Sequence, residues 1–183
     1  MPERSLYWVW FQIDTNRINS AGRLDSMNQL EAWARDDVVH IDMSAVARGE
    51  AVGRGSGPRA EKAHGYIFSE TLASTPDEQE QIRQIERILF PAGANSQNQR
   101  NDVEIVFNAL KYTRILVTND GDSKSQPGGI LGHATELNAL GIRVMRDSEA
   151  VRYVRDLLAQ RDANAREVAE LTGEPLPHWV GKD

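Results

Sequence analysis

The sequence predicts an α/β fold with a central, mainly parallel sheet. Apolar segments with strand character alternate along the chain with segments of helical periodicity. Two of the apolar segments, Leu6 to Ile13 and "RILVTND" at residues 114 to 120, have the composition of strands buried on both faces. Alternation of this kind is typical of strand–helix–strand units, which build parallel sheets.

Length and composition limit the class of protein. The 183 residues correspond to one domain, or to one domain with a tail, and 40% hydrophobic residues can bury a core. The absence of cysteine excludes disulfides and thiolate metal sites. No apolar run approaches the roughly 20 residues that cross a bilayer, and "MPERS" lacks a signal-peptide core, so we expect a soluble cytoplasmic protein.

The net charge of −6 argues against a whole-surface attraction to nucleic acid. It leaves room for a local basic groove, because phosphates respond to nearby Arg and Lys side chains. A surplus of acid also arises where carboxylates gather to hold a divalent cation. Composition alone leaves both readings open.

The first half of the chain predicts two strand–helix steps. A polar turn after Ile13 leads to a helix from Ser26 to Arg35. "DVVHID" then predicts a short strand, and "MSAVARGEAV" a second helix. The segment "GRGSGP", Gly53 to Pro58, is a glycine-rich loop with basic residues around it. Such a loop is either a surface connection or a ligand contact.

The middle of the chain predicts two further helices. Thr75 and Glu78 have capping-box spacing, with Pro76 in the first helical position. Asn101 is the predicted N-cap of the next helix, which "NDVEIVFNALKY" forms.

The last third predicts a helix over "LGHATELNAL" that ends at Gly141, a strand over "IRVM", and a long helix capped by Ser148. This helix is expected to continue to Leu171, and Trp179 to dock the tail. We therefore divide the chain into a domain of residues 1–158 and a helix extension with a tail, residues 159–183.

Five carboxylates fall where a ligand site is expected in such a sheet. Ligands of open α/β sheets bind outside the carboxyl ends of the strands. The residues predicted at that edge are Asp14, Glu50, Asp102, Asp120 and Asp122. Crowded carboxylates repel one another unless they take up protons or bind cations. Mg²⁺ and Mn²⁺ favour oxygen ligands, and a bound cation can polarise water and hold a phosphate oxygen. The cluster therefore indicates metal-dependent phosphodiester cleavage.

A structural explanation is available for each acid taken singly. An Asp at a strand end commonly forms a turn or caps a helix, and Asp102 would also satisfy a helix dipole. Glu50 alone could be a solvated helix residue. We assign Asp42 and Asp147, which also follow strands, structural roles. The joint pattern is what favours a site.

Three motifs carry a resemblance to a known family: "IDTN" at Ile13 to Asn16, "NDVEIVFNA" at Asn101 to Ala109, and "LVTNDGDS" at Leu116 to Ser123. Together with the spacing from Ser44 to Glu50, the ordered set resembles the PIN-domain family, metal-dependent ribonucleases that include toxins of bacterial toxin–antitoxin pairs. The resemblance spans about residues 6 to 158. It implies a three-layer α/β/α PIN-like fold around a mainly parallel sheet of about four to five strands.

The resemblance also implies a function and roles for residues. It implies a Mg²⁺- or Mn²⁺-dependent endoribonuclease with an RNA substrate, an antitoxin or other protein partner, and a homodimer. The metal ligands would be Asp14, Asp102, Asp120 and Asp122, with Glu50 as a further catalytic acid. Asn16, Thr118 and Ser123 would orient carboxylates or water. The substrate-contact candidates are Arg17, Arg54, Arg59, Lys62 and Lys124.

The chain departs from the family pattern after each of two motifs. "RINSAGR" follows Asp-Thr-Asn where the family has apolar residues, and Ser123 replaces the usual aromatic. Two alternatives remain, and the long polar segment between Glu50 and Asp102 and the overall acidity favour the first. One is a PIN-like interaction or regulatory module with a weakly active or inert site. The other is a phosphatase, which needs a second Asp two residues after the first strand's Asp, where this chain has Asn16.

Overall fold

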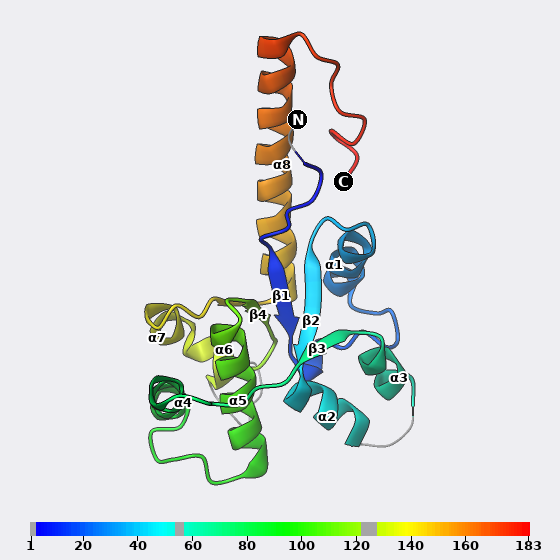
Figure 1. Cartoon of the computed structure of the whole chain (residues 1–183). Coiled ribbons are helices and arrows are strands. Elements are labelled where there is room, and N and C mark those ends of the chain that lie inside the picture. The colour runs from blue at the N-terminus through cyan, green and yellow to red at the C-terminus, as the bar shows by residue number, and fades with distance from the viewer. Residues whose placement is uncertain (1–2, 54–56, 122–127) are drawn as a thin grey trace.

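The structure is a computed structural model that describes residues 3–53, 57–121 and 128–183. Five parallel strands form one sheet in the order β3-β2-β1-β4-β5 (Figure 1). The strands are β1 (Trp10–Ile13), β2 (His40–Ser44), β3 (Ile67–Ser69), β4 (Ile115–Val117) and β5 (Val144–Met145). The predicted α/β class with a parallel sheet is confirmed.

Helices connect the strands and cover both faces of the sheet. They are α1 (Asp25–Arg35), α2 (Ala45–Gly53), α3 (Pro58–His64), α4 (Pro76–Leu89), α5 (Gln97–Lys111), α6 (Gly129–Gly132), α7 (Ala134–Ala139) and α8 (Asp147–Thr172). A 3-10 turn, η1 (Thr15–Arg17), follows β1 directly. On one face α5 packs against β2 and β4. Gln12 Nε2 donates a hydrogen bond of 2.8 Å to the Ile105 carbonyl of α5. On the other face α1 and α8 pack together (Figure 1).

The central strand is shorter than predicted. Only Trp10–Ile13 belongs to β1, so the prediction of a strand from Leu6 is wrong for its first half. Tyr7 and Trp8 are 61% and 57% exposed, whereas Phe11 and Ile13 are fully buried. Leu6 and Val9 are buried as well, but a turn at Tyr7 and Trp8 separates Leu6 from the strand. The strand leads directly into Asp14.

Two predicted helix starts are corrected and one is confirmed. The capping box of Thr75 and Glu78 is present at the start of α4, with Pro76 in the first turn. The N-cap of α5 is Ser96, in a capping box with Gln99, and not Asn101. Ser148 lies inside α8, whose N-cap is Arg146. At α5 the Ser96 hydroxyl accepts from the Gln99 N–H, whereas at α8 the Glu149 carboxylate accepts from the Arg146 N–H.

The segment between α2 and α4 contains two elements that the sequence pattern did not predict. Helix α3 begins after Gly57 with Pro58 in its first turn, and β3 is an edge strand that pairs with β2. Ile67 and Phe68 remain 67% and 42% exposed on β3. Without a buried face, this strand has no alternating pattern by which to recognise it.

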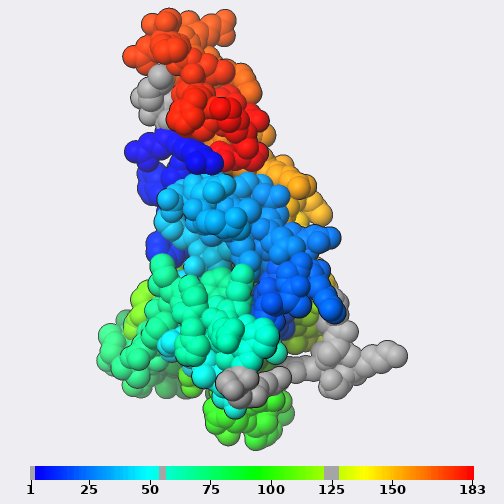
Figure 2. All heavy atoms as spheres, turned by 90° about the vertical axis from the view of Figure 1, so that its right-hand side faces the viewer, coloured from blue at the N-terminus to red at the C-terminus, as the bar shows by residue number. Residues whose placement is uncertain are grey.

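The last helix extends well beyond the sheet and carries the tail back to the N-terminal segment. Gly173 ends α8 at φ 71°, a left-handed conformation that suits glycine. Arg4 Nη2 lies 2.6 Å from Asp183 Oδ1, and Arg161 Nη1 lies 3.0 Å from Asp183 Oδ2. The Arg161 guanidinium also stacks on Trp179, which is buried as predicted. Figure 2 shows the red tail against the blue N-terminal segment.

Helix α8 is continuous across residue 158, so the proposed domain boundary stays a prediction. Among the helices in the described ranges, none combines the length and apolar character needed to cross a membrane.

Candidate functional site

Four of the predicted acids line one cavity at the carboxyl ends of the central strands. The cavity has a volume of about 370 Å³, and Asp14, Glu50, Asp102 and Asp120 are among its lining residues. They come from four places in the chain: the end of β1, helix α2, helix α5 and the loop after β4. Because β1, β2 and β4 are adjacent and parallel, the segments that follow them meet at one edge.

Asp14 is held by three hydrogen bonds from its own surroundings. Its Oδ1 accepts from the Thr15 backbone N–H at 2.5 Å, which starts the 3-10 turn. Its Oδ2 accepts from Asn16 Nδ2 at 2.6 Å and from Thr118 Oγ1 at 2.7 Å. Asp14 is only 6% exposed, so these donors replace water. Asn16 and Thr118 lie where the sequence predicted carboxylate-orienting residues.

Glu50 is fixed by neighbours on two sides. Its Oε2 accepts a hydrogen bond of 2.8 Å from Thr15 Oγ1, and its Oε1 accepts one of 2.6 Å from Asn101 Nδ2. Thr15 Oγ1 also lies 3.2 Å from the Ala47 carbonyl in the first turns of α2. The turn after β1 and helix α5 therefore both aim Glu50 at the cavity.

Asp120 and Asp102 are held in different ways. Asp120 Oδ2 accepts from the Ile130 backbone N–H at 2.7 Å, and the Asp120 N–H donates to Thr118 Oγ1 at 3.0 Å. Asp102, in the second turn of α5, receives no hydrogen bond or ion pair from any described residue. It therefore faces the cavity as a free carboxylate in a partly buried position.

Burial and mutual repulsion raise two carboxyl pKa values. Burial raises the pKa of Asp14 to about 6, although the hydrogen bonds from Thr118 and Thr15 work in the opposite direction. Burial, and then the charges of Asp14, Asp120 and Glu50, raise the pKa of Asp102 to about 8. The cluster thus lacks positive charge, which a proton or a cation would supply.

The donor set fits a hydrated divalent cation better than a fully protein-coordinated one. In the described part of the chain, no three His, Asp or Glu side chains are close enough to hold one metal ion directly. Both oxygens of Asp14 and of Glu50 already accept protein hydrogen bonds. Mg²⁺ keeps several of its waters and binds through one or two carboxylates, and Asp102 offers an unengaged one.

Arg59 is the one basic residue among the described residues that line the acidic cavity. Its Nη2 donates a hydrogen bond of 2.5 Å to the Thr15 carbonyl, and its Nε is buried without a hydrogen-bond partner. Helix α3 delivers this guanidinium to the site, although the helix itself was not predicted. A guanidinium that lines a cavity beside carboxylates is suited to an anion that enters the cavity.

The other predicted substrate-contact residues are placed differently. Lys62 lies 2.7 Å from Glu31 and lines a separate cavity whose other walls come from α1, β2 and the start of β3. Arg17 lies 3.0 Å from Asp147. The remaining predicted site residues, Arg54, Asp122, Ser123 and Lys124, lie outside the described residues.

Two polar residues of α5 were missed by the sequence prediction. Asn98 lines the acidic cavity, and Asn101 holds Glu50. Asn98, Asn101 and Asp102 have i, i+3 and i+4 spacing, which places them on one face of a helix. Recognition of the Ser96–Gln99 capping box would have started α5 early enough to show this face.

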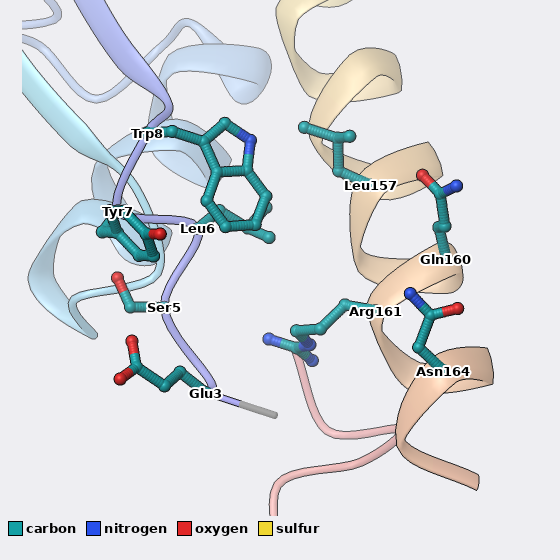
Figure 3. A pocket seen from close by; sticks show the side chains of 9 residues that line it. All are labelled: Glu3, Ser5, Leu6, Tyr7, Trp8, Leu157, Gln160, Arg161 and Asn164. Carbon is teal, nitrogen blue, oxygen red and sulfur yellow. The ribbon is translucent and has the colours of Figure 1, made fainter. Parts of the chain in front are cut away.

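A second and larger cavity lies at the opposite end of β1 and contains no acid cluster. It has a volume of about 550 Å³, between the N-terminal segment and α8. Figure 3 shows Trp8 and Leu157 facing one another across it. Its lining is mixed, with Arg161 already engaged by Asp162 and Asp183.

The fold and this edge define an α/β protein with an acidic cavity at the carboxyl ends of a parallel sheet. Neither a protein-family model nor a curated protein matches the sequence. PIN-domain proteins are among the solved structures that match, at low sequence identity.

Three of these structures illustrate the similarity. VapBC2 from Rickettsia felis bound to a promoter DNA fragment has TM-score 0.48 and 17% identity, covering 75% of this chain and 98% of that one. FitAB bound to a DNA fragment has TM-score 0.45 and 15% identity, and the match covers 75% of this chain and 94% of that one. A PilT N-terminus domain protein from Sulfolobus solfataricus has TM-score 0.44 and 11% identity over 80% and 93%.

Proposed function

We propose that this protein is a divalent-metal-dependent endoribonuclease that hydrolyses RNA phosphodiester bonds at the acidic cavity. One observation carries the proposal: Asp14, Glu50, Asp102 and Asp120 line a single cavity together with Arg59. Four clustered acids with one guanidinium are suited to hold a cation and a phosphate side by side.

When bound, Mg²⁺ or Mn²⁺ supplies a Lewis acid that acidifies water and offsets charge on phosphate. The chain's own residues supply the holding and the orientation. Asp102 and Asp120 are the proposed ligands, with Asp14 acting through water. Asp122, which the resemblance also implies, lies outside the described residues. Asn16 and Thr118 hold Asp14 in one orientation through hydrogen bonds of 2.6 and 2.7 Å. Glu50, aimed by Thr15 and Asn101, is placed to accept a proton or to hold a water.

Arg59 is the residue proposed to contact the RNA substrate. Arg59 lines the same cavity as the acids, so its guanidinium can donate to a phosphate oxygen. We propose single-stranded or looped RNA rather than duplex, because a pocket at a sheet edge needs an accessible backbone.

The test is cleavage of an end-labelled single-stranded RNA by purified protein with Mn²⁺, with Mg²⁺, and with EDTA. We expect metal-dependent cleavage that Asp14→Asn abolishes. Asp156→Asn is the matched control, because Asp156 is exposed on α8 far along the chain from the cavity, and it should cleave as the wild type does. Cleavage retained in Asp14→Asn would remove the proposed chemistry.

A second candidate is a PIN-like protein-interaction module with an inert site. The observation that favours it is the exposure of Tyr7 and Trp8, 61% and 57%, beside the 550 Å³ cavity. This candidate predicts no heat of Mn²⁺ binding at millimolar metal, and a protein partner that co-purifies and is lost in Trp8→Ala.

The toxin role and the partners implied by the resemblance extend the proposal. They predict that expression of the chain slows growth and that a small antitoxin gene lies beside its own. A homodimer is tested by light scattering of the purified protein.

A further inference from the structure

Arg17 follows the Asp-Thr-Asn motif and lies between two parts of the chain. Its Nη1 lies 3.0 Å from Asp147 Oδ2, and the two side chains are only 12% and 15% exposed. Its Nε lies 3.0 Å from both the carbonyl oxygen and the Oδ1 of Asn16. Arg17 thus connects the first residue of α8 with the turn after β1.

The amide of Asn16 is held at its oxygen end by two donors. Oδ1 accepts from Arg17 Nε and from the Asn119 backbone N–H, each at 3.0 Å. The nitrogen end then points to Asp14 Oδ2 at 2.6 Å. Because an amide accepts only at oxygen and donates only at nitrogen, fixing one end determines what the other end can do.

The start of α8 supports both donors. Asp147 accepts a hydrogen bond from Arg17, and Arg146 Nη1 donates one of 2.8 Å to Asn119 Oδ1. Asp147 Oδ1 in turn accepts from the Ser148 N–H at 2.9 Å, so its carboxylate is itself fixed by the first turn of the helix. The N-cap and the first residue of α8 therefore reach the two groups that orient Asn16.

We infer that the Arg17–Asp147 pair is a positioning device for the acidic site, acting through Asn16 on Asp14. The inference rests on the proposed function for its catalytic consequence. Arg17 then neither binds metal nor contacts RNA. A mostly buried ion pair adds little net stability but specifies a single arrangement, which is the use made of it here.

The direct test is hydrogen exchange of the Asn16 side-chain amide by NMR. In Arg17→Ala we expect its protection to fall about fivefold or more, as for loss of a charged hydrogen bond. Arg23→Ala is the matched control, since Arg23 is an exposed arginine in the same loop, and it should leave protection unchanged. Arg17→Lys keeps a positive charge for Asp147 and lacks Nε. It should lose protection as Arg17→Ala does, even if the alanine variant folds poorly.

Kinetics distinguish positioning from substrate contact. Loss of a group that orients a metal-site carboxylate lowers metal affinity or activity about 10- to 100-fold. We expect Arg17→Lys to raise the Mn²⁺ dissociation constant about tenfold and to lower kcat, with KM for RNA within about twofold of the wild type. A raised KM with unchanged kcat would make Arg17 a phosphate contact and overturn the inference.

The two levels of the proposal fail in different ways. Wild-type protein that neither binds Mn²⁺ nor cleaves RNA, while Arg17→Lys still loses Asn16 protection, removes the nuclease function and leaves the positioning device standing. Unchanged Asn16 protection in both Arg17 variants removes the positioning device, whatever the wild type cleaves.

Discussion

Asn101 donates a hydrogen bond of 2.6 Å to Glu50, joining helix α5 to helix α2 across the acidic cavity. Glu50 receives its second hydrogen bond from Thr15, the residue after Asp14. One glutamate is therefore held by two elements that also carry proposed metal ligands. Its orientation and the spacing of the acids are set together.

Removal of this amide is expected to impair the site more than the fold. In Asn101→Ala, Glu50 keeps only its bond to Thr15, so we expect cleavage to fall about tenfold or more. The unfolding free energy should fall by only about 1 kcal/mol, as for one partly buried hydrogen bond. Single-turnover cleavage and urea denaturation measure the two effects. Equal cleavage by the variant and the wild type would show that Glu50 needs no such support.

Replacement of Asp102 by Asn is expected to stabilise the metal-free protein while abolishing activity. The pKa of Asp102 is raised to about 8 by burial and by neighbouring acids, so its ionised form is disfavoured in the fold. The substitution removes that repulsion and also removes the one unengaged carboxylate of the site. We expect a higher midpoint of thermal unfolding than the wild type in EDTA at pH 8.

Bound metal should make the wild type more stable than Asp102→Asn, which is the reverse of the order expected in EDTA. A ligand at about 100 times its dissociation constant adds about 2.7 kcal/mol to stability. Mn²⁺ should therefore raise the unfolding midpoint of the wild type and leave Asp102→Asn unchanged. The same Mn²⁺ shift in both proteins would place the cation elsewhere.

Arg59 and Lys62 form a natural pair for testing substrate contact, because both lie on α3 and only Arg59 lines the acidic cavity. A hydrogen bond to a charged group contributes about 1.5–3 kcal/mol, so Arg59→Ala should lower kcat/KM for RNA about 10- to 100-fold. Lys62→Ala, which loses the ion pair to Glu31, should leave kcat/KM near the wild-type value. Similar losses in both variants would argue for a general effect of α3 on the fold.

Asp42 should make the stability of the protein depend on pH. It lies fully buried in β2 with Arg114 Nη1 2.5 Å away, and burial outweighs this cation and raises its pKa to about 7 from 3.8. Since the folded pKa is the higher one, the contribution of Asp42 to stability is fully present below pH 3.8 and is lost as the pH rises to about 7.

The measurement compares urea denaturation of wild type and Asp42→Asn between pH 4 and pH 8. We expect the wild type to lose stability relative to the variant across the window from about 4 to about 7, with a constant difference above it. The other raised groups, Asp14 and Asp102, are present in both proteins and cancel. A constant difference over the whole range would mean that Asp42 does not titrate there.

Much of the architecture could be predicted because local rules and the global fold agree. The capping box at Thr75 and the buried strand that ends at Asp14 follow from spacing alone. The edge strand β3 could not be recognised, since Ile67 and Phe68 are exposed and give no alternation. The role of Arg59 depends on the unpredicted helix α3.

Asp14 and Asp120 were predicted from their positions at strand ends, whereas most of the groups that hold the acids were not predicted. Strand ends in a parallel sheet converge by topology, so a single chain position suffices to place Asp14 and Asp120. The bonds from Asn101 to Glu50 and from Arg17 to Asp147 join residues 51 and 130 positions apart. No local periodicity encodes such a pairing.

The bond between Arg4 and Asp183 also has a practical consequence for handling the molecule. Arg4 and Asp183 both lie beside α8, away from the sheet edge where β1 ends (Figure 1). A purification tag or a surface anchor at either end therefore leaves the acidic cavity facing solution. For the same reason, dyes at the two ends would report by energy transfer on detachment of the tail, without touching the acids.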